Sequence, residues 1–227
     1  MQWNFYLSGI LYGKFYVKDN DIFVEKLDAA KGIWYPKETF TEESDDFFKK
    51  LCSRSLLDFF KNKKEYEEKI SEGADEFTAS SGETFSNRRN EVYFQRQKKF
   101  PKDLFYDEDG IYAVLMSGRD FAAVLVKNGE EDRTILSRWK KAFPEPPAAV
   151  NFLGTFFVDT RDGEKLATDV YLPKGEAYKE QKVPSVLIRT PYGKGERPEQ
   201  YYRFVQRGYA VVIQDTRGRE DSTGEWL

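Results

Sequence analysis

Few side chains in this sequence could carry out covalent catalysis. The 227 residues include no histidine and one cysteine, Cys52. A Ser-His-Asp arrangement, a histidine general base and a histidine metal site are therefore impossible within these residues. A single cysteine also excludes an internal disulfide and a cysteine-built zinc site. A catalyst made from these residues alone must use carboxylates, lysines, tyrosines or backbone groups, and we expect no cofactor.

The best candidates for chemistry follow two apolar runs in the last third of the chain. Residues 183–189 and 209–214 have the composition of parallel strands buried on both faces, and a short helix over 199–206 could join them. Tyr192 follows the first run, and Asp215 follows the second. Because the carboxyl ends of parallel strands meet at one edge of a sheet, we expect these side chains to gather there.

The same region resembles a known family of α/β-hydrolases, the Xaa-Pro dipeptidyl-peptidase family, which includes cocaine esterase. The likeness covers about residues 152–227, a third of the chain, and the motifs stand in the family's order. They are Thr160-Arg-Asp-Gly163, Leu166-Ala-Thr-Asp-Val-Tyr-Leu-Pro173, Ile188-Arg-Thr-Pro-Tyr-Gly-Lys194, Arg207-Gly-Tyr-Ala-Val-Val-Ile-Gln-Asp-Thr-Arg-Gly-Arg219 and Asp221-Ser-Thr-Gly-Glu-Trp226.

The resemblance implies the N-terminal portion of an α/β-hydrolase fold, a hairpin followed by a parallel βαβ unit. It also implies a serine acyl hydrolase acting on small-molecule esters or amides or on short peptides. In such enzymes one donor to the oxyanion is a tyrosine hydroxyl on the loop after the third strand, and the match gives that role to Tyr192. The alternative for Tyr192 is a tyrosine that only packs over the strand end.

Other polar residues near this edge are expected to be structural. We expect Asp215 and Arg217 to form ion pairs or a turn network that holds the loop. Ser222 lies in an Asp-Ser-Thr-Gly turn without a histidine or a G-x-S-x-G context, so we do not assign it as a nucleophile. Glu220 stands where the family usually has glycine, which predicts a slightly different backbone there.

The serine elbow, aspartate and histidine of the family lie beyond the position that matches Leu227. We therefore expect this chain to be an N-terminal fragment of a longer hydrolase, inactive by itself. The alternative is a non-catalytic binding module that retains a degenerate hydrolase domain.

Three segments are expected: a small α+β domain over 1–143, a Pro-rich linker over 144–150 and the hydrolase-like part over 151–227. In the first, apolar residues recur at helical spacing over 47–60, which predicts one core-facing helix that includes a buried, inert Cys52. Its start could be capped by Thr39 or by Ser44. Strands are expected at 14–18, 22–24, 92–94, 111–115 and 121–126, and a mobile loop over about 73–87.

Charge and composition restrict the partners. The sequence has 36 Lys and Arg residues against 39 Asp and Glu residues, and this balance gives little electrostatic support for a nucleic-acid or membrane partner. The amino terminus lacks the basic start of a signal peptide. With one cysteine, a reducing cytoplasm is the expected location.

Overall fold

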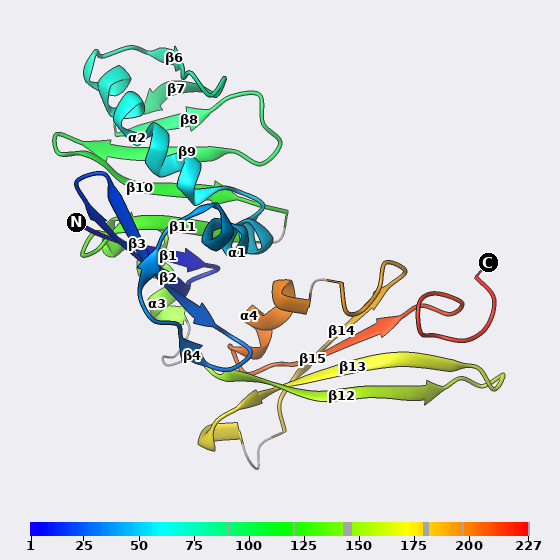
Figure 1. Ribbon diagram of the computed structural model, residues 1–227. Coiled ribbons are helices and arrows are strands. Elements are labelled where there is room, and N and C mark those ends of the chain that lie inside the picture. Colours follow the sequence, from blue (N-terminus) through cyan, green and yellow to red (C-terminus); the bar gives the residue numbers. More distant parts are fainter. Residues whose placement is uncertain (90, 120, 143–146, 179–181, 197, 227) are drawn as a thin grey trace. The chain divides into compact units, whose positions relative to one another are not determined.

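The computed structural model describes residues 1–89, 91–119, 121–142, 147–178, 182–196 and 198–226. The chain divides into two compact units, each with its own sheet (Figure 1). The first contains Met1–Leu27 and Trp34–Ala142, and the second contains Asp28–Ile33 and Phe143–Leu227. Residues 143–146, in and beside the expected linker, lie outside the described residues, and the first strand of the second unit already begins at Ala149.

The first unit is built on an 11-stranded sheet with the order β4-β3-β2-β1-β11-β10-β9-β8-β7-β6, while β5 pairs with β3. Antiparallel pairing joins β2 to β3 and β10 to β11, so the strands expected in these places are confirmed. The strands are β1 (Gln2–Leu7), β2 (Ile10–Lys18), β3 (Asp21–Asp28), β4 (Ile33–Trp34), β5 (Glu38–Thr39), β6 (Glu76–Thr78), β7 (Thr84–Arg89), β8 (Val92–Gln95), β9 (Lys102–Asp107), β10 (Gly110–Ser117) and β11 (Ala122–Lys127).

The single helix expected over 47–60 is wrong, because two helices, α1 (Glu42–Cys52) and α2 (Leu56–Ser71), share this stretch. Ser53 ends α1 in the left-handed region, with φ of 54°. The buried carboxylate of Asp45 then accepts hydrogen bonds from the main-chain N–H groups of Leu56 and Leu57, at 2.9 and 3.2 Å. One helix therefore caps the start of the next, a contact that apolar periodicity does not reveal.

The amino-terminal cap of α1 also differs from both expected caps. Thr41 is the cap residue, and it forms a reciprocal capping box with Ser44. Among its described residues this unit has one more α-helix, α3 (Leu136–Ala142), which follows a 3₁₀ turn over Glu131–Arg133.

The expected core face of this helical stretch is confirmed. Phe48 of α1 packs edge-on against Phe5 of β1, with ring centroids 5.3 Å apart, and Phe59 of α2 packs in the same way against Trp3 at 5.7 Å. Cys52 is buried, and this burial raises the pKa of its thiol to about 12. A thiol with such a pKa remains protonated and unreactive at neutral pH.

The expected mobile loop over 73–87 is also wrong, since β6 and β7 form an antiparallel hairpin within it. Phe77 and Phe85 are opposite each other in this hairpin, and their rings stack 5.3 Å apart above Tyr66 of α2. The Gly and Ser residues that suggest a loop lie mainly at the ends of the β6–β7 hairpin and in the turn between its strands. Tertiary burial of two aromatic rings thus overrides the local composition.

The second unit combines a long hairpin with a parallel pair of strands. Strands β12 (Ala149–Asp159) and β13 (Lys165–Lys174) pair antiparallel across the Asp162-Gly163 turn, and β14 (Ser185–Thr190) pairs parallel with β15 (Ala210–Asp215). A 3₁₀ turn over Glu176–Tyr178 follows β13. A second 3₁₀ turn, Pro198–Tyr201, and the short helix α4 (Tyr202–Val205) connect β14 to β15.

The strand order β12-β13-β15-β14 leaves β14 at an edge of this sheet. The apolar run over 183–189 predicts a strand covered on both faces, but Leu187 of β14 is 54% exposed. Phe156 and Phe157 of β12 are also about half exposed, at 49% and 56%. In the described part of the chain, no helix has the length and apolar character needed to cross a membrane.

Candidate functional site

Tyr192 lies on the loop that leaves the carboxyl end of β14. In the parallel register Thr190 at the end of β14 is opposite Asp215 at the end of β15. The main-chain N–H of Thr216 donates to the carbonyl of Thr190 at 3.0 Å, which keeps the two strand ends together. The loop that carries Tyr192 and the strand end at Asp215 therefore lie at the same edge of the sheet, as expected from the sequence.

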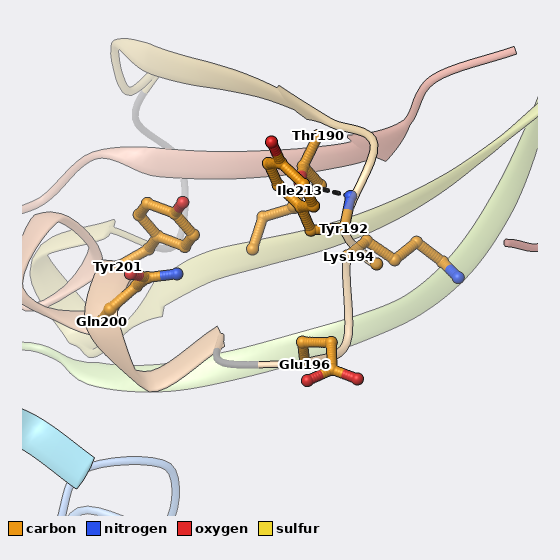
Figure 2. Close-up of a pocket in the computed structure, with 8 residues that line it drawn as sticks. Thr190, Tyr192, Lys194, Glu196, Gln200, Tyr201 and Ile213 are labelled. Atoms are coloured by element: carbon orange, nitrogen blue, oxygen red, sulfur yellow. Dashed lines mark hydrogen bonds between the residues drawn. The ribbon is translucent and has the colours of Figure 1, made fainter. Parts of the chain in front are cut away.

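A pocket of about 320 Å³ opens beside this loop, and Tyr192 forms part of its wall. Figure 2 shows the phenol rings of Tyr192 and Tyr201 on different sides of the pocket, while the Lys194 side chain extends away from Tyr201. The lining residues come from the end of β14, from the loop after it, from the 3₁₀ turn over Pro198–Tyr201 and from β15: Thr190, Tyr192, Gly193, Lys194, Glu196, Gln200, Tyr201 and Ile213.

The Tyr192 side chain is 79% exposed, and no hydrogen bond to its hydroxyl is present among the described residues. The backbone around it is held instead. The Tyr192 N–H donates to the hydroxyl of Thr190 at 3.1 Å, and the guanidinium of Arg219 donates to the carbonyl of Pro191 at 3.1 Å. Gly193 has a φ of +92°, a conformation that favours glycine.

Lys194 binds the buried carboxylate of Asp215 at two points. Its main-chain N–H donates to Oδ1 at 2.6 Å, and its Nζ donates to Oδ2 at 3.2 Å. The same Nζ reaches Asp221 Oδ2 at 2.5 Å. Burial acts to lower the pKa of Lys194, but the two carboxylates outweigh it, so the pKa is raised overall and the side chain stays charged.

Arg217 has a different role from Asp215, although we expected both residues to hold the loop. Its guanidinium pairs with Asp162 and lies 3.7 Å from Glu164, both at the turn between β12 and β13. Hydrogen bonds from Thr160 and Arg217 lower the pKa of Asp162 to about 2. Arg217 therefore anchors the loop after β15 to the hairpin rather than to the Tyr192 loop.

Ser222 has the structural role that we expected. Its side chain is buried, its hydroxyl donates to the carbonyl of Asp215 at 2.9 Å, and it accepts from the N–H of Ala167 at 2.9 Å. Both contacts join the loop after β15 to the sheet. A buried hydroxyl with both contacts to the backbone is placed to connect two segments, not to attack a substrate.

Glu220, the residue that departs from the family pattern, has a φ of +49°. This left-handed conformation is the one in which glycine carries little steric cost. The turn therefore has a backbone conformation that favours glycine although its residue is a glutamate, and the expected difference from the family's backbone stays a prediction.

Sequence reasoning missed three of the residues that hold the loop, namely Lys194, Arg219 and Asp221. Lys194 was visible only as the last residue of the Ile188–Lys194 motif. Its partner Asp215 is 21 residues away along the chain. A usable signal in the sequence was that each residue comes after an apolar run expected to be a parallel strand, because parallel strands end at the same edge of a sheet.

Comparison with known proteins finds a family match in the second unit. Residues 162–227 match the family model described as X-Pro dipeptidyl-peptidase (S15 family). The cocaine esterase of Rhodococcus sp. (strain MB1 Bresler) is 42% identical over an alignment of 76 residues, and the match covers 31% of this chain and 12% of the esterase. The chain therefore spans about an eighth of the length of the curated relative that it matches.

Two solved structures are each similar in sequence over 34% of the chain. An α-amino-acid ester hydrolase is 32% identical, covers 34% of this chain and 14% of its own, and superposes with a TM-score of 0.30. An aminopeptidase from a marine sediment archaeon, Thaumarchaeota archaeon, is 30% identical with the same coverage and a TM-score of 0.30. The resemblance expected from the motifs is thus confirmed: residues 162–227 are similar to the X-Pro dipeptidyl-peptidase (S15) family.

Proposed function

We propose that the second unit is part of a serine hydrolase that cleaves ester or amide bonds, and that it supplies an oxyanion donor, Tyr192. In this reaction a serine oxygen attacks the carbonyl carbon, and negative charge develops on the former carbonyl oxygen. A hydroxyl held toward that oxygen stabilises the charge by donating a hydrogen bond. Collapse of the tetrahedral intermediate then releases the alcohol or amine.

In this proposal, residues outside these 227 supply the nucleophile and its base. The sequence has no histidine that could accept the serine proton. Ser222, the serine nearest to the loop network, is buried and bound to two backbone groups. Tyr192 therefore contributes to the transition state, while the bond-making groups are supplied separately.

One observation carries the proposal: within the family-like segment, the Tyr192 phenol is exposed beside a pocket at the carboxyl ends of two parallel strands. Open α/β sheets bind their ligands at this end of the strands. The hydroxyl has no hydrogen-bond partner among the described residues and is available to a ligand. A tyrosine that only packed over the strand end would be expected to bury more of its ring.

The substrate class in this proposal is a small ester or amide or a short peptide. A pocket of about 320 Å³ is near the lower end of the range for small-molecule sites. The proposed setting is the cytoplasm, which is consistent with one buried cysteine.

A chimera tests the proposal: the cocaine esterase with its matching 76-residue segment replaced by the corresponding segment of this chain. Its turnover of a nitrophenyl ester is measured before and after Tyr192→Phe. The change removes one oxyanion donor, so kcat should fall by about 10²- to 10³-fold while KM changes little. The matched control is Tyr209→Phe, which removes a hydroxyl from a residue outside the pocket lining.

The 227-residue chain by itself serves as the blank and should not hydrolyse the ester above background. An unchanged kcat in a folded Tyr192→Phe chimera would show that the tyrosine only packs over the strand end. Turnover by the isolated chain that one substitution abolishes would show that its own residues supply a nucleophile.

A further inference from the structure

We infer that Lys194 and Asp215 are positioning residues for Tyr192, and that together with Asp221 they hold the Tyr192 loop in one conformation beside the pocket. We call these three residues the Lys194 clamp. The role of the clamp in catalysis rests on the proposed function, whereas the contacts that form the clamp do not depend on that function.

Tyr192 needs such support because its own side chain provides little. Tyr192 as a residue is 79% exposed, and the next residue, Gly193, adopts a positive φ that few other residues tolerate. Glycine gives the backbone more freedom than any other residue. Contacts of the flanking residues must therefore determine the direction of the phenol.

The clamp acts on the residue directly after this glycine. The Lys194 N–H and Nζ bind the two oxygens of the same carboxylate, so both the backbone and the side chain of Lys194 are fixed. Asp215 is completely buried and is the last residue of β15, and Lys194 is 7% exposed. A rigid strand end thus holds the loop two residues after Tyr192.

The residues before Tyr192 are held by residues that follow β15. Arg219 donates to the Pro191 carbonyl, and Thr216 donates through its N–H to the Thr190 carbonyl. The Asp221 N–H lies 3.4 Å from Asp215 Oδ2, so the loop after β15 also completes the clamp. Tyr192 therefore lies between two residues of its own loop that are held in place, Pro191 before it and Lys194 after it.

The chemistry of the clamp favours a positioning role over simple stabilisation. Removing a lysine and an aspartate from water is costly, and apolar residues of similar size often stabilise a fold equally well. An ion pair with a main-chain hydrogen bond specifies one geometry, which an apolar contact does not. Fixing a donor before the reaction is the property that an oxyanion site requires.

Fluorine NMR of the 227-residue chain tests the inference, with 3-fluorotyrosine incorporated only at position 192. In the unsubstituted chain we expect a resonance shifted from that of free fluorotyrosine. Lys194→Met removes the charge but retains a chain of similar length, and Asp215→Asn retains the shape of the carboxylate. Both should move the resonance toward the free value, and Lys194→Arg should restore part of the shift.

Hydrogen exchange on the same samples separates loosening of the loop from unfolding. In Asp215→Asn the main-chain amide of Lys194 should exchange at least about tenfold faster, while the main-chain amide of Val212 in β15 remains protected. The matched control is Lys165→Met, which breaks an exposed ion pair with Asp159 in the same unit and should leave the Tyr192 resonance unchanged.

An unchanged fluorine resonance in folded Lys194→Met would overturn the inference, whatever the exchange of the Lys194 amide. If Asp215→Asn unfolds the unit, as loss of Val212 protection would show, Lys194→Met alone decides the result. The proposed function is tested separately: a moved resonance together with an unchanged kcat in the Tyr192→Phe chimera would leave the clamp valid and refute the oxyanion role.

Discussion

Lys194 donates both its main-chain N–H and its side-chain Nζ to the carboxylate of Asp215, at 2.6 and 3.2 Å. Asp215 is the last residue of β15, Lys194 lies on the loop after the parallel strand β14, and neither is appreciably exposed. This relationship ties the loop that carries Tyr192 to the end of the central strand β15. It also leads to predictions about the stability of the second unit.

Replacing one member of the pair should destabilise the second unit more than replacing both. Asp215→Leu leaves the Lys194 charge without its buried partner and should cost about 3 to 5 kcal/mol. The double variant Lys194→Met with Asp215→Leu should cost less than the single change. The free energy of opening is measured from native-state hydrogen exchange of the β15 amides, which reports on this unit alone.

Lys165→Met is the control for that experiment. Its ion pair with Asp159 has a distance of 2.7 Å but side chains that are 54% and 72% exposed. Such a pair is worth less than about 1 kcal/mol. If the double variant Lys194→Met with Asp215→Leu lost as much stability as the two single variants together, the prediction would be contradicted.

Glu220→Gly should stabilise the second unit by about 1 kcal/mol. Glu220 has a φ of +49°, where a side chain adds steric strain that glycine avoids. The greater freedom of glycine in the unfolded chain removes part of this gain. The same exchange measurement applies, with Glu225→Gly as the control because that residue has no positive φ. Equal effects of the two changes would show that strain at position 220 is negligible.

The first unit should lose stability in acid through Glu83. This carboxylate accepts hydrogen bonds from Tyr66, Lys102 and Gln95 at 2.6, 2.8 and 2.7 Å. Burial raises the pKa of Glu83, but Lys102 and the hydrogen bonds lower it further, so the folded-state pKa is below the ordinary 4.5. The stabilisation is therefore complete above about pH 5 and is lost as the pH falls through the folded-state pKa.

Urea denaturation of Glu83→Gln as a function of pH checks this. The variant should be less stable than the unsubstituted chain at pH 7, and the difference should shrink toward pH 3. Glu68→Gln on the exposed face of α2 is the control, since its pair with Lys64 is long, at 3.8 Å. A Glu83→Gln deficit that stays constant with pH would rule out the charge as its cause.

The amide of Leu187 should exchange faster than the amide of Ile188. The carbonyls of Pro184 and Thr190 accept hydrogen bonds from β15, so the even-numbered residues of β14 face that strand. The main-chain groups of odd-numbered residues then point to the edge where no described strand pairs. We expect at least about a tenfold difference in exchange rate. Equal protection in a monomer would mean that the edge is covered.

The sequence by itself determined several of the local elements and the family likeness. The β2–β3 hairpin, the β12–β13 hairpin and the two parallel strands follow from apolar patterns with turn residues between them. The motifs from Thr160 to Trp226 led to Tyr192 as the candidate residue. All these features depend on residues that are close together in the chain.

Only the tertiary structure decided which distant residues meet. Ser53 ends the first of two helices along one apolar stripe, and Asp45 caps the start of the second. Burial of Phe77 against Phe85 makes a hairpin of a segment whose composition predicts a loop. Lys194 meets Asp215 because the parallel register places their strand ends together. Local periodicity records the preference of each segment, whereas hydrogen bonds and burial between segments depend on the folded arrangement and leave no short-range pattern.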